Sequence, residues 1–309
     1  MEDHKEDLKK ENWLKQLDWV REFSEGSKWH RLTSRPVEYL NAIFKRKVLY
    51  PIKRKPSNVK RLTFFGQEIS IPLPVSTDIY LAGAKTHDSE IRLARFLIRH
   101  LKKNHQYLDI GAHIGFFSML AAELCGKNGK ILSVEPSSNI HGYLKTNISQ
   151  YSQVRAIQAL VSEKSGITSF FEFDTLYSEY NTLLPDQYDK SDWYASHLPE
   201  KTSRDSYTIE DLCNKFELSP DIIKIDVEGA EYQVVSTLKD TSLCPMIIME
   251  YILQENKDMT HDLALEHLTS IGYEMKRIDR EGNLVPGDQF RETMREKGLT
   301  SDNIVFVRN

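Results

Sequence analysis

The chain has 309 residues, a formal net charge of −4 and 40% hydrophobic residues. This composition is typical of a globular protein with one large domain, or one domain and an extension, and gives no general support for nucleic-acid binding. Its three cysteines are isolated from one another, so we predict neither a metal-binding spacing nor a disulfide framework. No apolar run approaches the roughly 20 residues that span a bilayer, and the polar N-terminus does not resemble a signal peptide. We therefore expect a cytoplasmic protein.

Residues 1–85 are predicted to form an N-terminal extension. It should contain a first helix around Trp13–Phe23, a second from Pro36 to about Phe44, and a hairpin built from Arg61–Phe65 and Glu68–Ile71. The stretch 45–61 is basic and contains no acidic residue. Such runs usually form a solvated surface, and the alternative is docking to an anionic acceptor or peripheral contact with a membrane.

The segment Tyr107–Ser118, YLDIGAHIGFFS, is predicted to form a strand, a turn and the start of a helix. Asp109 lies at the end of the strand, and Gly111 and Gly115 flank the turn. A unit of this kind binds a nucleotide cofactor at the carboxyl edge of a sheet. His113 takes the place where a dinucleotide fingerprint requires glycine near a pyrophosphate. We therefore predict a cofactor without a diphosphate, S-adenosylmethionine.

A second strand, KILSVE, ends at Glu135. This acid lies roughly twenty residues beyond the glycine turn, where a carboxylate accepts hydrogen bonds from ribose hydroxyls. A third strand, Ile222–Ile225, ends at Asp226, whose side chain should face the same crevice. The candidate cofactor-binding residues are Asp109, Gly111, Ala112, His113, Gly115, Glu135, Pro136, Ser137 and Asp226.

The alternation of helices and strands that follows the turn predicts a parallel sheet. Strands are expected at Val154–Val161 and Ile167–Phe173. Asp174–Asp205 lacks periodicity and is rich in aromatic residues, so we predict a lid over the acceptor, with a simple spacer as the alternative. Within it, Tyr180 and Trp193 are candidate acceptor-binding residues because aromatic side chains stack on sugar rings and flat natural products.

The motifs DIGAHIGFFS, VEPS, IIKIDVEGAEYQVV and MIIMEY together resemble the FkbM family of S-adenosylmethionine-dependent methyltransferases, from about Glu90 onward. The resemblance implies a class I, Rossmann-like α/β fold with a mostly parallel seven-stranded sheet and an antiparallel edge strand over residues 86–309. It also implies O-methylation, often of sugars or polyketide-type products, and cofactor roles for Asp109, Gly111, Gly115 and Glu135. The family usually has Asn where this chain has His113. The resemblance specifies neither the acceptor nor the base.

In this fold the segment before the first strand lies over the methionine end of the cofactor. His87 and Glu90 are therefore candidates for contact with that end or with the acceptor, and the alternative for both is a capping or surface role.

A hydroxyl acceptor needs a base or a metal ion near the transferred methyl group. The candidates are His113, Asp226, Glu228 and Glu250, all expected on loops at the carboxyl edge. His113 has a suitable intrinsic pKa but can equally serve to shape the cofactor loop. Asp226 and Glu250 are candidate ligands of Mg²⁺, which prefers oxygen.

Two other classes of protein use similar motifs. An NAD(P)-dependent oxidoreductase would also require the two glycines and Glu135, although His113 and the lack of a Tyr-x-x-x-Lys motif argue against it. A non-catalytic nucleotide-binding module would need neither Asp109 nor Glu135. A nucleic-acid acceptor is not expected, because no aromatic residues alternate with the basic stretch. The expected partner is a small-molecule or glycan acceptor, and the oligomeric state is left open.

Overall fold

The computed structural model describes residues 2–185, 193–239, 245–253 and 260–308. It divides the chain into two compact units. Unit 1 comprises Met1–His100 and Arg280–Gly282, and unit 2 comprises Leu101–Asp279 and Asn283–Asn309. The structure thus groups the helix that follows residue 85 with the first unit, and the domain boundary at that residue stays a prediction.

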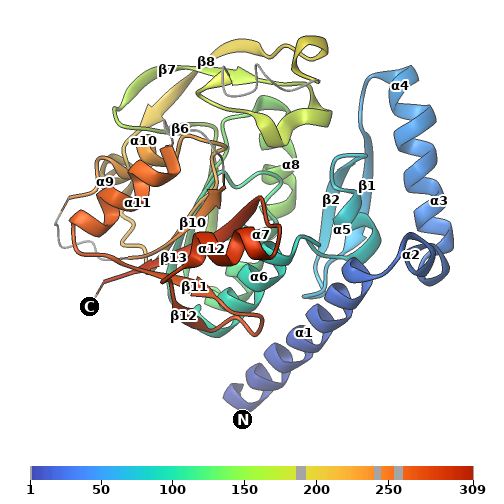
Figure 1. Ribbon diagram of the computed structural model, residues 1–309, viewed down its shortest axis with the longest axis horizontal. Coiled ribbons are helices and arrows are strands. Elements are labelled where there is room, and N and C mark those ends of the chain that lie inside the picture. Colours follow the sequence, from blue (N-terminus) through green and yellow to red (C-terminus); the bar gives the residue numbers. More distant parts are fainter. Residues whose placement is uncertain (1, 186–192, 240–244, 254–259, 309) are drawn as a thin grey trace. The chain divides into compact units, whose positions relative to one another are not determined.

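Unit 1 is mainly helical (Figure 1). Its elements are α1 (Glu2–Glu25), α2 (Lys28–Ser34), α3 (Pro36–Phe44), the π-helical turn η1 (Lys45–Leu49), α4 (Tyr50–Lys53), β1 (Ser57–Leu62), β2 (Glu68–Leu73), α5 (Thr77–Ala82) and α6 (Asp88–His100). Both predicted N-terminal helices are present. In α1 the side chains of Trp13, Leu17 and Phe23 are buried, as their helical spacing predicts.

The predicted hairpin is present but begins earlier, because β1 starts at Ser57 and pairs antiparallel with β2. Residues 63–65, expected in the first strand, form the turn instead. The apolar residues Phe64 and Phe65 do not belong to a strand, because they lie in the turn and both rings pack edge-on against Trp13. Their burial in a turn explains why the prediction of strand was wrong there.

Unit 2 is built on an eight-stranded sheet in the order β12-β11-β13-β10-β9-β3-β4-β5. These strands are β3 (Gln106–Ile110), β4 (Lys130–Val134), β5 (Val154–Ile157), β9 (Ile222–Ile225), β10 (Met246–Ile252), β11 (Glu274–Ile278), β12 (Leu284–Pro286) and β13 (Ser301–Val307). From β10 to β5 the strands are parallel, whereas β13 is antiparallel to β10 and β11. This is the predicted α/β arrangement, with the short β12 added as an eighth strand.

The central strands β3, β4 and β9 are almost entirely buried, which explains their continuous apolar sequences. The helices of unit 2 are α7 (Phe116–Cys125), α8 (Ser138–Ile148), α9 (Ile209–Phe216), α10 (Glu231–Val235), α11 (Thr260–Ser270) and α12 (Phe290–Glu296). In Figure 1, α7 and α8 lie on one side of this sheet and α9, α10 and α11 on the other. The carboxyl ends of β3, β4, β9 and β10 therefore meet at one edge between two helical layers.

A second, three-stranded sheet of β6 (Leu160–Val161), β8 (Glu200–Tyr207) and β7 (Gly166–Glu172) differs from the prediction. The strand expected at 154–161 is divided between the two sheets, and β7 pairs antiparallel with β8 rather than extending the parallel sheet. Residues 200–205, expected in the lid, belong to β8. This strand is polar and largely exposed, so it lacks the apolar pattern that identifies a strand.

The small sheet is bound to the loop that follows β4. On β8, Arg204 donates hydrogen bonds to the Pro136 carbonyl oxygen (2.7 Å) and to Glu172 Oε2 (2.9 Å). The Ser137 hydroxyl donates to the other oxygen of Glu172 (2.7 Å). Because Arg204 and Glu172 are both largely buried, this charge pair is shielded from solvent and fixes the loop that carries Glu135.

In the part of the chain that the structure describes, no helix combines the length and apolarity needed to cross a membrane.

Candidate active site

The turn after β3 has the strained backbone that its glycines permit. Gly111, His113 and Gly115 all have positive φ angles, of 75°, 49° and 87°. A Cβ atom at position 111 would overlap the carbonyl oxygen of Asp226. Glycine is therefore required at this position because the loops after β3 and β9 touch. This requirement holds whether or not a ligand is bound.

Asp109 is completely buried and begins a chain of polar side chains under the turn. The Ser118 hydroxyl donates to Asp109 Oδ2 (2.6 Å), and the Ser133 hydroxyl donates to Ser118 (2.8 Å). These bonds connect β3, α7 and β4 inside the core. Asp109 thus fixes the elements that form the turn.

Lys224 supplies the positive charge that Asp109 needs. It lies in the buried strand β9 directly opposite Asp109 in register. Its ammonium group lies 3.4 Å from Asp109 Oδ1, 3.2 Å from Asp226 Oδ2 and 3.3 Å from the Gly111 carbonyl oxygen. Burial alone would lower the pKa of Lys224, but attraction to Asp226 and Asp109 outweighs this effect and raises the pKa. Lys224 therefore stays charged and holds both loops.

Glu135 is buried at the end of β4, and its carboxylate spans the cofactor turn. Its oxygens accept hydrogen bonds from the backbone N–H groups of His113 (2.9 Å) and Ser137 (2.9 Å). Burial raises the pKa of Glu135 to about 7, although the two backbone bonds oppose this shift. The acid expected at the ribose is thus in contact with the glycine turn.

The remaining predicted cofactor residues contribute mainly through their backbone. Ala112 is buried, and its N–H donates to the Val134 carbonyl oxygen (3.0 Å). The Pro136 carbonyl oxygen accepts from Arg204, and the Ser137 hydroxyl caps α8 at Ile140 (3.3 Å). The side chain of Ser137 is therefore already used by the protein.

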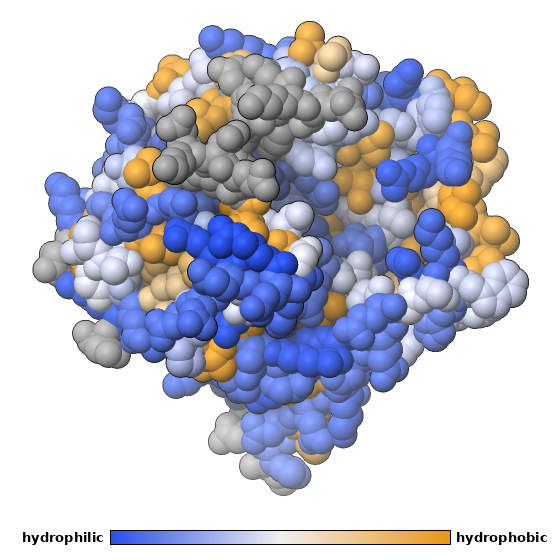
Figure 2. Space-filling model, viewed as in Figure 1, coloured by the Kyte–Doolittle hydropathy of each residue, from blue (hydrophilic) through white to orange (hydrophobic). Residues whose placement is uncertain are grey.

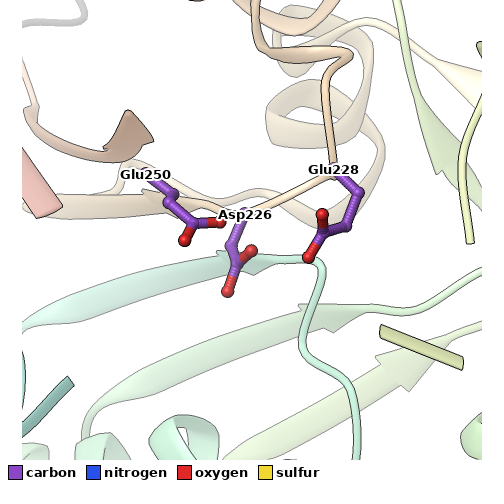
Figure 3. Close-up of side chains that lie close together, drawn as sticks. All are labelled: Asp226, Glu228 and Glu250. Carbon is purple, nitrogen blue, oxygen red and sulfur yellow. The ribbon is translucent and has the colours of Figure 1, made fainter. Parts of the chain in front are cut away.

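Asp226, Glu228 and Glu250 come together at the carboxyl ends of β9 and β10 (Figure 3). Each offers a carboxylate oxygen, and these atoms lie within 4.8 Å of one another. Burial, followed by repulsion from Glu250 and Asp226, raises the pKa of Glu228 well above its ordinary value. Such a group can share a proton or hold a cation. Glu228 also has a positive φ of 50°, a conformation that is uncommon for a residue other than glycine.

The start of the predicted lid contacts both loops. The helical turn η2 (Thr175–Tyr180) places the Ser178 hydroxyl 3.4 Å from His113 Nε2. The Thr182 hydroxyl donates to the Glu228 carbonyl oxygen (2.9 Å). The first part of the segment is therefore connected to the cofactor turn and to the acidic loop.

Aromatic rings gather on the same segment. The Trp193 ring is stacked on Tyr177 at 5.0 Å between centroids and lies 4.8 Å from Tyr180. Tyr180 is 38% exposed, so part of its ring faces solvent. Residues 186–192 of the predicted lid lie outside the described residues, and the lid role stays a prediction.

Glu231 is the first residue of α10 and pairs with a histidine of α11. Its Oε2 lies 2.8 Å from Nδ1 of His261, and both side chains are buried. Its other oxygen accepts from the Gly229 N–H (3.3 Å). This pair connects the turn of the DVEG motif with α11, a partner that the sequence pattern did not indicate.

His87 and Glu90 lie in unit 1. His87 Nδ1 is 2.7 Å from the Ser89 hydroxyl, and Glu90 forms an ion pair with Lys85 (3.2 Å). These are the capping and surface roles that were considered as alternatives, and their relation to the cofactor stays a prediction.

We predict that Lys224→Met lowers the free energy of unfolding by about 3–5 kcal/mol, because it leaves the fully buried Asp109 charge unpaired. Urea denaturation followed by fluorescence would measure this loss. The exposed Lys145→Met is the matched control and should change stability by less than about 0.5 kcal/mol.

Adding Asp109→Asn to Lys224→Met should recover part of the loss, since the unpaired charge is then removed. Equal stability of Lys224→Met and Lys145→Met would show that the ion pair does not hold the loops.

The sequence matches the methyltransferase FkbM domain over residues 109–275, more than half of the chain. No curated protein matches it. Among solved structures, the chain is similar to precorrin-6y C5,15-methyltransferase from Geobacter metallireducens, with 13% identity, a TM-score of 0.40, and coverage of 71% of this chain and 88% of that one.

TYW2 of M. jannaschii, solved with AdoMet, has 14% identity and a TM-score of 0.40, with 82% and 88% of the two chains covered. An S-adenosylmethionine-dependent O-methyltransferase from Thermotoga maritima has 12% identity and a TM-score of 0.38, with 82% and 78% covered. The domain match spans the glycine turn, Glu135 and the DVEG loop. The chain therefore belongs to the FkbM methyltransferase family.

Proposed function

We propose that the protein is an S-adenosylmethionine-dependent O-methyltransferase that acts on a hydroxyl group of a sugar, a glycan or a related natural product. The observation that carries this proposal is the group of Asp226, Glu228 and Glu250 beside the cofactor turn. The buried Cys125 and Cys213 are not joined in disulfides, which is compatible with the cytoplasmic location that we propose for it.

The residues at this edge fit the methyl donor. The buried Glu135 carboxylate suits the two ribose hydroxyls, which are hydrogen-bond donors. The acidic side chains that follow β9, with Glu250 near the carboxyl end of β10, suit the positive sulfonium and amino groups. When bound, the cofactor supplies an electrophilic methyl group, so the protein has only to orient the acceptor oxygen and remove its proton.

Glu228 is our candidate for the group that receives this proton. Its pKa is raised by burial and by its acidic neighbours, which makes its carboxylate a stronger base than an ordinary glutamate. Asp226 is held by Lys224 and would orient the acceptor hydroxyl. Mg²⁺ bound between Asp226 and Glu250 is the second candidate for activating that hydroxyl.

The aromatic rings of Tyr177, Tyr180 and Trp193 support a flat or sugar-like acceptor. They lie on the segment that contacts both His113 and Glu228. Ring faces bind the apolar faces of sugars, and the exposed part of Tyr180 offers such a surface.

For the cofactor site, we predict that affinity for S-adenosylhomocysteine increases from pH 6 to pH 8. Glu135 has a pKa of about 7, so it is mainly protonated at the lower pH and ionised, and hence a better acceptor, at the higher one. Calorimetric titration would measure this slope. Glu135→Gln should bind S-adenosylhomocysteine about 1–3 kcal/mol more weakly at pH 8, and its affinity should depend little on pH. His113→Asn, the control for titration of the histidine, should keep the slope.

The stability of the protein without bound ligand should instead decrease as the pH rises. A raised pKa means that Glu135 contributes stability below the unfolded value of 4.5 and that this contribution is lost as the pH rises to about 7.

S-adenosylhomocysteine should raise the melting temperature, whereas NAD and NADP should leave it unchanged. Stabilisation by NAD alone would overturn the proposed donor.

For the acidic group, we predict that Glu228→Gln lowers kcat by about 10²–10⁴-fold, the usual contribution of a general base. Asp226→Asn should also lower kcat, and its melting temperature should fall less than that of Lys224→Met, because Asp109 still pairs with Lys224. The assay is transfer of a labelled methyl group to a panel of free, lipid-linked and nucleotide-linked sugars. Glu210→Gln, an exposed glutamate on α9, is the control.

Treatment with EDTA separates the two candidate mechanisms. Activity that survives EDTA supports Glu228 as the base, whereas activity that is lost and then restored by Mg²⁺ supports the cation. Near-normal turnover by both Glu228→Gln and Asp226→Asn would exclude the acidic group from catalysis.

For the acceptor side, Tyr180→Leu should lower kcat/KM for the acceptor by roughly tenfold through an increase in KM, since a ring contact of this kind contributes about 1 kcal/mol or more. Affinity for S-adenosylhomocysteine should stay unchanged. Tyr207→Leu, a partly buried tyrosine that contacts Lys215, is the matched control. Equal kinetics of the two variants would assign the aromatic cluster a purely structural role.

A further inference from the structure

In unit 1, the continuous helical segment 36–53, made of α3, η1 and α4, exposes an apolar face. The exposed side chains, with their exposed fractions, are Val37 (74%), Leu40 (58%), Phe44 (53%), Val48 (43%) and Ile52 (76%). They recur every three or four residues, which places them along one side of the helix. We call this set the docking face.

The buried residues of the same helix, Ala42 and Tyr50, lie on its other side. A helix on the surface of a globular protein normally has the reverse pattern, with polar residues outward. Side chains spaced four residues apart shift gradually around the axis of an α-helix, which has 3.6 residues per turn. The wider π-helical turn η1 offsets part of this shift between Phe44 and Ile52. The apolar side chains therefore stay aligned along the full length.

Basic side chains border the docking face. The exposed ones are Lys47, Lys53, Arg54 and Lys55, whereas Arg46, four residues from both Ala42 and Tyr50, lies on the other side. No acidic residue occurs between Glu38 and Glu68. In Figure 2, hydrophobic side chains gather where Figure 1 places α3 and α4, with strongly hydrophilic ones beside them. The surface thus combines an apolar strip with positive charge, and Glu38, the one acid of the segment 36–53, pairs with Arg35 and Arg61.

We propose that the docking face binds an anionic membrane surface, with the helix lying in the plane of the interface. Phe44, Ile52 and their apolar neighbours would enter the boundary of the acyl chains, and the bordering Lys and Arg side chains would contact acidic headgroups. A second copy of the chain is a poorer occupant. An isologous contact through this face would bring the two sets of basic side chains together without acids between them.

Co-sedimentation of the full chain with vesicles tests the proposal. We expect binding to phosphatidylcholine vesicles that contain about a third phosphatidylserine, weak binding to pure phosphatidylcholine, and a loss of binding at high salt. The double variant Phe44→Ser/Ile52→Ser should weaken binding at least about tenfold, since both side chains lose their apolar contact. Removing Lys53 and Lys55 by K53Q/K55Q should weaken it by about fivefold per charge.

Matched controls lie in unit 2. Ile167, 79% exposed on β7, and Lys164, whose side chain is 84% exposed, offer the same residue chemistry and are not part of the docking face. Ile167→Ser and Lys164→Gln should bind vesicles like the wild type. Far-UV circular dichroism would confirm that Phe44→Ser/Ile52→Ser keeps its helices.

Three outcomes would overturn the proposal. The first is a wild-type chain that does not sediment with the anionic vesicles. The second is equal binding to both kinds of vesicle. The third is a wild-type dimer in light scattering that Phe44→Ser/Ile52→Ser converts to a monomer while vesicle binding stays unchanged, because the face would then be a contact between copies.

Discussion

The ammonium group of Lys224 is the constraint on which the site depends. It lies in the core of the sheet between the carboxylates of Asp109 and Asp226, at the ends of two neighbouring parallel strands. A buried lysine and a buried aspartate are each costly alone, and their pairing removes most of that cost. The pairing also requires the loops after β3 and β9 to meet, which they do where Gly111 has no side chain. Stability and the geometry of the crevice therefore have the same origin.

The carboxylates at this edge differ because their neighbours differ. Asp109 and Asp226 have Lys224 within 3.4 Å, whereas Glu135 accepts backbone N–H bonds that only partly offset the cost of its burial. The pKa of Glu135 consequently rises to about 7. Burial and acidic neighbours raise the pKa of Glu228 further. One sheet edge thus holds acids that pair with the buried Lys224 and acids whose pKa is raised, and the proposed ligand and proton-transfer roles use the second kind.

The parts of this site that sequence could predict are those determined by strand ends. Asp109 and Asp226 end apolar strands, and parallel strands place such residues at one edge. Lys224 could also be noticed in the sequence, since a lysine within the apolar strand IIKI requires a buried partner. That this partner is Asp109 follows only from the register of β9 against β3. Strand β8 left no signal, because its polar, largely exposed residues pair through backbone bonds and Arg204 contacts. Residues held by distant partners, as Glu231 is by His261, are fixed only by the tertiary fold.

The small sheet and the segment between β7 and β8 connect the loops that follow β3, β4 and β9. Glu172 at the end of β7 binds Ser137, next to Glu135, and Thr182 binds the backbone of Glu228. Between these two attachments, η2 brings Ser178 to His113. The region that carries the aromatic rings is therefore held at the cofactor loop and at the acidic loop together. A ligand that shifts either loop would also shift this segment, so hydrogen bonds would couple the proposed donor and acceptor sites.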